Sequence, residues 1–166
     1  IQRSFDADRL VGHLTALARV PSPQTAFFES EPQVQAFIRD HELVGRVVIL
    51  GRFRHDAVHH VYRAADLFIY PSLCESFGFP QVEAMASGLP IIAADRPLSR
   101  EICGEAAEYY PPHDAAALAD LVSSLRGDAG RREALVRAAG IQAQRFSWSD
   151  HVDAVMAVAE EVASAS

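Results

Sequence analysis

Short apolar runs alternate along the chain with longer segments whose apolar residues recur at helical spacing. The apolar runs predict strands near residues 25–28, 46–50, 66–70, 90–94 and 107–110. The amphipathic segments predict helices at about residues 6–20, 31–42, 56–64, 80–87, 114–126, 129–145 and 148–163. Strands that alternate with helices indicate an α/β fold, a three-layer sandwich whose mostly parallel sheet is covered by helices on both faces.

Three of the predicted strands run into loops, at Gly51, Pro71 and Asp95. Ligands of open parallel sheets bind outside the carboxyl ends of the strands. We therefore expect these three loops to converge on one cleft.

The segment from Pro71 to Pro90 combines two carboxylates, a glycine loop and a helix start. Glu75 and Gly78 lie in the loop after the strand at 66–70, and Pro80 fits a first helical position, which places Glu83 in the first turn. Free N–H groups at a helix start suit a phosphate, and carboxylates accept hydrogen bonds from hydroxyls. The segment therefore predicts a site for a sugar, a diphosphate and a ribose.

Each of these residues also has an explanation that needs no ligand. A glutamate in a loop is usually solvated, and a glutamate in the first turn of a helix complements the helix dipole. Gly78 also fits a turn that needs glycine only for its backbone conformation. Only the combination of the two carboxylates, the glycine loop and the flanking strands favours a ligand site.

The stretch from Glu75 to Glu83 resembles the Glu-x7-Glu signature of retaining nucleotide-sugar glycosyltransferases of family 4 (group 1), which have the GT-B fold. The similarity covers about residues 45–160 and includes Phe146-Ser147-Trp148. It implies that residues 1–166 form a single nucleotide-sugar-binding domain, the Rossmann-like C-terminal half of a GT-B fold. The final helix, 147–166, would then reach toward an N-terminal domain that the chain lacks.

The resemblance also implies roles for individual residues. Glu75 would be catalytic by orienting the transferred sugar, and Glu83 would hold the ribose. The other donor-binding positions belong to the glycine loop and to the loop after the strand at 46–50. They are Ser76, Phe77, Gly78, Phe79, Gly51, Arg52 and Phe53. Phe53 fits a core position equally well.

By resemblance, the protein is a hexosyltransferase that transfers a hexose-type sugar from a nucleoside diphosphate sugar to a glycan or glycolipid acceptor. The acceptor would be bound by the missing N-terminal domain. The family needs no cofactor and no metal for this reaction. Its bacterial members build surface polysaccharide or glycolipid, which implies a cytoplasmic protein, peripheral at the inner membrane.

One departure from the family argues that this chain alone is inactive. Related enzymes direct an Arg and a Lys at the donor diphosphate from the loop after their first strand, whereas this chain has fifteen arginines and no lysine. Two alternatives therefore stay open. The chain is a non-catalytic nucleotide-sugar-binding module, or it belongs to another GT-B enzyme such as an epimerase.

Composition and charge exclude several other classes. A net charge of −7 argues against non-specific binding of nucleic acid, and two cysteines are too few for a disulfide framework. His55, His59 and His60 suggest a zinc site, but no acidic or cysteine ligand completes it, so a polar helix face is the better interpretation.

The final predicted helix carries an apolar stripe. Val152, Val155, Met156 and Ala159 recur at helical spacing after Trp148. We expect this stripe to be partly exposed without the N-terminal domain and to offer a contact for a dimer.

Overall fold

The computed structural model describes residues 31–49 and 57–164. In this range three parallel strands form one sheet: β1 (Phe68–Tyr70), β2 (Ile91–Ala94) and β3 (Ala107–Tyr110), in that order. Ile69 of β1 pairs with Ile92 of β2, which pairs in turn with Glu108 of β3. The α/β class and the parallel sheet predicted from the sequence are confirmed.

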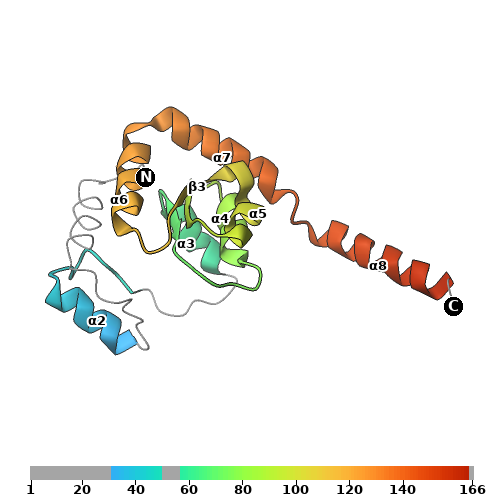
Figure 1. The fold of residues 1–166 in the computed structure, drawn as a ribbon, viewed down its shortest axis with the longest axis horizontal. Helices are drawn as coiled ribbons and strands as arrows, with labels where there is room; N and C mark the ends of the chain where they lie inside the picture. Colours follow the sequence, from blue (N-terminus) through green and yellow to red (C-terminus); the bar gives the residue numbers. More distant parts are fainter. Residues whose placement is uncertain (1–30, 50–56, 165–166) are drawn as a thin grey trace.

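Helices occupy most of the remaining described residues (Figure 1). They are α2 (Glu31–Asp40), α3 (Val58–Ala64), α4 (Phe79–Ala86), α5 (Pro97–Cys103), α6 (Ala115–Gly127), α7 (Ala129–Ala143) and α8 (Trp148–Ser164), with a 3₁₀ turn η2 (Gly104–Ala106). The starts of α6 and α7 are capped by Asp114 and Asp128, whose carboxylates accept hydrogen bonds from backbone N–H groups three residues later, at 2.9 Å. Such caps fix where a helix begins.

The core lies on both faces of the sheet because β2 is buried along its whole length. Ile91 and Ala93 pack in a cluster with residues of α4, α5 and α7. The alternate residues, Ile92 and Ala94, pack with residues of α6 and with Leu135. This alternation produces the three layers and leaves the carboxyl ends of the strands for the loops that follow them.

The structure corrects two sequence predictions. The prediction of a strand at 46–50 is wrong over residues 46–49. There the described backbone shows only an isolated bridge between Val44 and Val47. Val48 is 69% exposed there, because no described strand pairs with this segment. Helix α5 was not predicted. The helix expected at 6–20 and the strand expected at 25–28 lie outside the described residues.

Helix α8 extends away from the sheet and from the helices that cover it (Figure 1). All of its side chains are exposed, including the apolar stripe expected from the sequence. Within the described residues, no helix combines the length and the apolar character needed to cross a membrane.

Candidate donor-binding site

Glu75 lies in the loop that follows β1, as the sequence predicts. Its side chain is exposed. The hydroxyl of Ser72 donates a hydrogen bond to its Oε1 at 2.8 Å, which ties the carboxylate to its own loop. A carboxylate has room for further hydrogen bonds, so Glu75 can still accept one from a ligand hydroxyl.

Gly78 forms the corner at which the loop turns into α4. Its φ is +83°, in the left-handed region, and no side chain caps the helix here. A Cβ at this position would lie 2.7 Å from Nε2 of Gln81 and 3.2 Å from Cδ1 of Ile102. Glycine therefore suits residue 78 for its backbone conformation, and a Cβ there would have to displace the ends of the buried Gln81 and Ile102 side chains.

The first N–H groups of α4 are partly used within the helix. Pro80 has no N–H, and the N–H of Gln81 donates to the carbonyl of Gly78 at 3.0 Å. The groups best placed for a phosphate are therefore those of Phe77, Gly78 and Phe79. The rings of Phe77 and Phe79 lie 4.6 Å apart and are both exposed. Ser76, also exposed, completes this loop.

Glu83 does not lie in the first turn of its helix, which corrects the sequence prediction. Because Gly78 turns the chain early, α4 begins at Phe79 and its first turn holds no acidic residue. The half-buried Glu83 instead faces α3, where the hydroxyl of Tyr62 donates to its Oε2 at 2.9 Å. Burial, together with this carboxylate, raises the pKa of Tyr62 well above its usual value, so the hydroxyl keeps its proton.

A pocket of about 240 Å³ opens beside Glu75. Its walls come from the end of β1, the loop after it, α4 and the start of α5. They comprise Tyr70, Ser72, Leu73, Cys74, Glu75, Gln81, Arg96, Pro97, Leu98 and Ser99. A larger cavity of about 480 Å³ lies at the opposite ends of the strands, beside Leu67 and Pro90, away from the two glutamates. Tyr70, Gln81 and Arg96 were not predicted as site residues, because their only sequence signal is their closeness to Glu75 or Asp95.

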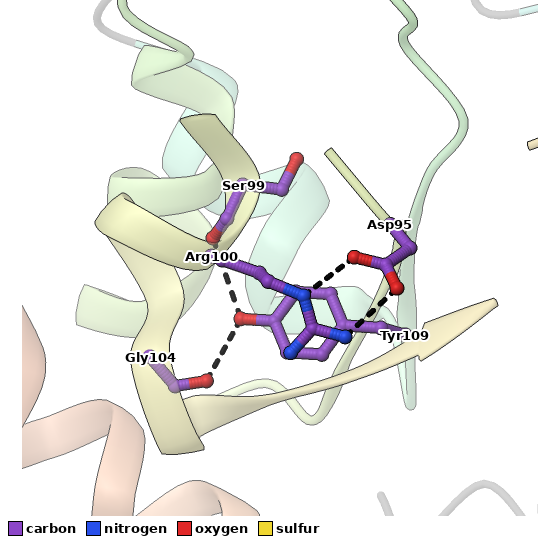
Figure 2. Close-up of polar contacts among 5 residues, drawn as sticks. All are labelled: Asp95, Ser99, Arg100, Gly104 and Tyr109. Carbon is purple, nitrogen blue, oxygen red and sulfur yellow. Dashed lines mark hydrogen bonds and ion pairs between the residues drawn. The ribbon is translucent and has the colours of Figure 1, made fainter. Parts of the chain in front are cut away.

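The loop after β2 is fixed by a cluster around Arg100 (Figure 2). The guanidinium of Arg100 donates to both carboxylate oxygens of Asp95, at 2.5 and 2.8 Å, and lies over the ring of Tyr109, 4.4 Å from its centre. The hydrogen bond from Arg100 lowers the pKa of Asp95. Because β1 and β2 pair in parallel, their carboxyl ends lie side by side. The loops at Pro71 and Asp95 therefore start from neighbouring positions, as expected.

The remaining residues considered from the sequence are those of the Gly51 loop and the histidines. Gly51, Arg52, Phe53 and His55 lie outside the described residues. His59 and His60 are exposed on α3, with their rings 3.8 Å apart. Over 31–49 and 57–164 no three His, Cys, Asp or Glu side chains gather as a metal site would require.

The two cysteines are expected to differ strongly in reactivity. Cys74 is exposed in the pocket loop, whereas Cys103 is buried in α5 and burial raises its pKa to about 12. At pH 8 a thiol reagent should therefore modify Cys74 rapidly and leave Cys103 unmodified, because the thiolate is the reactive form. Mass spectrometry of the labelled protein measures this, with the urea-unfolded chain as the control in which both react. Rapid labelling of Cys103 in the folded chain would contradict the burial described here.

Comparison with known proteins places this arrangement in a family. The family described as "Glycosyl transferases group 1" matches residues 29–141, more than half of the chain. The phosphatidyl-myo-inositol mannosyltransferase of Mycobacterium leprae is 38% identical over 126 residues, which are 74% of this chain and 33% of that protein. The O-antigen chain mannosyltransferase B of Escherichia coli is 35% identical over 107 residues, 64% of this chain and 28% of that protein. The chain thus spans about a third or less of these relatives.

Solved structures show the same fold. Sucrose-phosphate synthase from Thermosynechococcus elongatus aligns with a TM-score of 0.77 and 24% identity, over 95% of this chain and 43% of that one. Anabaena Alr3699/HepE in complex with UDP aligns with a TM-score of 0.68 and 28% identity, over 91% and 44%. The C-terminal domain of a group 1 glycosyl transferase from Francisella tularensis aligns with a TM-score of 0.63 and 20% identity, over 88% and 81%. The chain therefore belongs to the group 1 glycosyltransferases and has the fold of their C-terminal domain, one half of the GT-B fold.

Proposed function

We propose that this chain is the donor-binding half of a retaining glycosyltransferase that transfers a hexose-type sugar from a nucleoside diphosphate sugar to a glycan or glycolipid acceptor. The acceptor would be bound by an N-terminal domain outside this chain. Mannose is the first sugar to test, because two of the relatives are named as mannosyltransferases.

The observation that carries the proposal is the placement of Glu75 and Glu83 on the two sides of the corner at Gly78. Glu75 is exposed in the loop before the corner, and Glu83 is half-buried on the helix after it. Between them lie backbone N–H groups that no side chain caps. The two carboxylates can each accept hydrogen bonds from hydroxyls, and the N–H groups between them can donate to phosphate. This order along the chain suits a sugar, a diphosphate and a ribose. A relative of the same fold, Alr3699/HepE, was solved with UDP bound.

In this proposal the chain contributes positioning and charge stabilisation. The N–H groups of Phe77, Gly78 and Phe79 would stabilise the negative charge that develops on the leaving diphosphate. Glu75 would accept a hydrogen bond from a hydroxyl of the transferred sugar and hold the sugar in place. The chain needs no general acid to protonate the leaving group, because a nucleoside diphosphate is stable as an anion.

Calorimetric titration of the 166-residue chain with UDP, GDP and ADP tests the proposal. We expect one of the three to bind measurably, and its sugar conjugate to bind more tightly than the bare nucleotide. Glu75→Gln should reduce the affinity for the conjugate by about 10-fold or more while sparing the bare nucleotide, as for loss of a charged hydrogen bond.

Two results would count against the proposal. Failure of all three nucleotides to bind at millimolar concentration would remove its basis. Loss of bare-nucleotide affinity in Glu75→Gln would show that Glu75 belongs to the nucleotide part of the site. Ser72→Ala is the matched control, since it removes the hydrogen bond to Glu75 and keeps the carboxylate.

A further inference from the structure

The loop between β1 and α4 has little backbone hydrogen bonding of its own. Within the residues that the structure describes, no N–H from Ser72 to Gly78 donates to a backbone carbonyl. The hydroxyl of Ser72 donates to Glu75, which fixes only the first half of the loop. The second half, whose N–H groups are proposed to bind the diphosphate, therefore depends on side-chain contacts for its shape.

The ring of Phe77 makes these contacts. It lies 4.6 Å from the ring of Phe79 and 5.9 Å from the ring of Phe146, measured between ring centres. The rings of Phe77 and Phe146 are nearly perpendicular, at 86°, which is a favoured arrangement of two aromatic side chains. Phe79 belongs to the same corner of the chain, so Phe146 is the ring that ties the loop to a distant segment.

Phe146 is itself held in place from several sides. It lies in the segment between α7 and α8 (Figure 1), and its half-buried ring packs against the core cluster of α4, α5 and α7. Its N–H donates to the carbonyl of Ala143 at 3.1 Å. One turn earlier, Nε2 of Gln142 donates to the carbonyl of Ile102 at 2.7 Å and joins the end of α7 to α5. Phe146 therefore presents its ring to the loop from a fixed position.

The exposure of the two loop rings argues against a role in filling the core. Phe77 is 37% exposed and Phe79 is 55% exposed. The side chain and the N–H of Phe77 share one Cα, so a ring that is fixed limits how far its own peptide group can rotate. Binding groups that are held in this way bind more tightly, because less conformational freedom is lost when the ligand arrives.

We propose that Phe146 is a positioning residue of the donor site: its ring fixes Phe77 and thereby holds the N–H groups of Phe77 and Gly78 in the orientation that binds the diphosphate. The inference rests on the proposed function and adds the junction between α7 and α8 to the site. Phe146 acts through Phe77 and not by contact with the ligand.

A double-mutant cycle on the two rings tests this inference. Calorimetry measures the affinity of the 166-residue chain for the tightest-binding of UDP, GDP and ADP. Phe146→Ala and Phe77→Ala are each expected to weaken binding about 10-fold, as for loss of a hydrogen bond to a charged group. The double variant should bind no more weakly than either single variant, because both remove the same contact. Phe146→Tyr keeps the ring and should keep the affinity.

The effect on stability needs its own control. Phe146→Ala removes a half-buried ring and lowers the melting temperature. Leu121→Ala removes a half-buried side chain on the other face of the sheet, so it should also destabilise the fold but leave the nucleotide affinity unchanged. If Phe146→Ala does not fold, Phe146→Leu replaces it, since leucine keeps most of the volume without the ring. Phe146→Leu should weaken binding about 2- to 10-fold.

The outcomes separate the two proposals. If the unaltered chain binds none of the three nucleotides, the proposed function and this inference both fall. If it binds one of them and the folded Phe146 variant binds that nucleotide equally well, this inference alone falls. Losses that add in the double variant would also overturn it, because Phe146 would then act independently of Phe77.

Discussion

Replacing Gly78 by alanine is expected to reduce the free energy of unfolding by about 2–5 kcal/mol. An L-residue in the left-handed conformation costs about 1–2 kcal/mol, and an added methyl group in a packed region costs about 1–3 kcal/mol. Both effects apply, because Gly78 has a φ of +83° and a new Cβ would lie 2.7 Å from Nε2 of Gln81. Urea unfolding followed by circular dichroism measures the change. Nucleotide binding should fall as well, since this corner presents the N–H groups of the loop.

Gly88 offers a matched control at the other end of α4. Its φ is +73°, but a Cβ there would meet only Cγ1 of Val136, at the ordinary distance of 3.9 Å. Gly88→Ala should therefore show the conformational cost alone, about 1–2 kcal/mol. Equal destabilisation by the two substitutions would mean that the contacts around Gly78 are looser than described.

Glu83→Gln should weaken binding of the nucleoside diphosphate by about 10- to 150-fold, with little effect on the fold. A hydrogen bond to a charged group contributes about 1.5–3 kcal/mol, and glutamine keeps one oxygen that can still accept from Tyr62. Calorimetry with the tightest-binding of UDP, GDP and ADP measures the loss. Equal affinities of the two proteins would remove Glu83 from the nucleotide site.

Tyr62→Phe distinguishes binding from stability at the same position. The substitution removes the donor that now occupies Oε2 of Glu83. The chain should lose about 0.5–1.5 kcal/mol of stability, while its nucleotide affinity stays equal or rises, because the carboxylate is released for the ribose. A fall in affinity would indicate instead that Tyr62 is needed to hold Glu83 in place.

Much of the fold could be predicted because its signals are local. The strands β1, β2 and β3 are short apolar runs, and Pro71 and Asp95 directly follow two of them. The glycine loop and the two glutamates are close in sequence, so their placement around the start of α4 followed from the same segment. The position of α4 was off by one residue because the left-handed turn at Gly78 has no sequence signal beyond the glycine itself.

The missed features depend on contacts between distant segments. Val47, Val48 and Ile49 have a strong strand pattern, but a strand also needs a partner, which a local pattern does not supply. Helix α5 has only seven residues, which are too few to show a clear helical period in the sequence. The pocket beside Glu75 likewise forms only when β1, α4 and α5 pack together.

The exposure of α8 has a consequence for how the chain unfolds. A 17-residue helix whose side chains are all exposed is marginally stable in water, and α8 carries four acidic residues and no arginine. Glu160 and Glu161 lie near its C-terminus, where negative charge opposes the helix dipole. Its amide protons should therefore exchange with solvent through local opening, independently of β2 and its neighbours, whose protons await global unfolding. The chain thus has two levels of cooperativity, and a single unfolding free energy describes only the part built around the sheet.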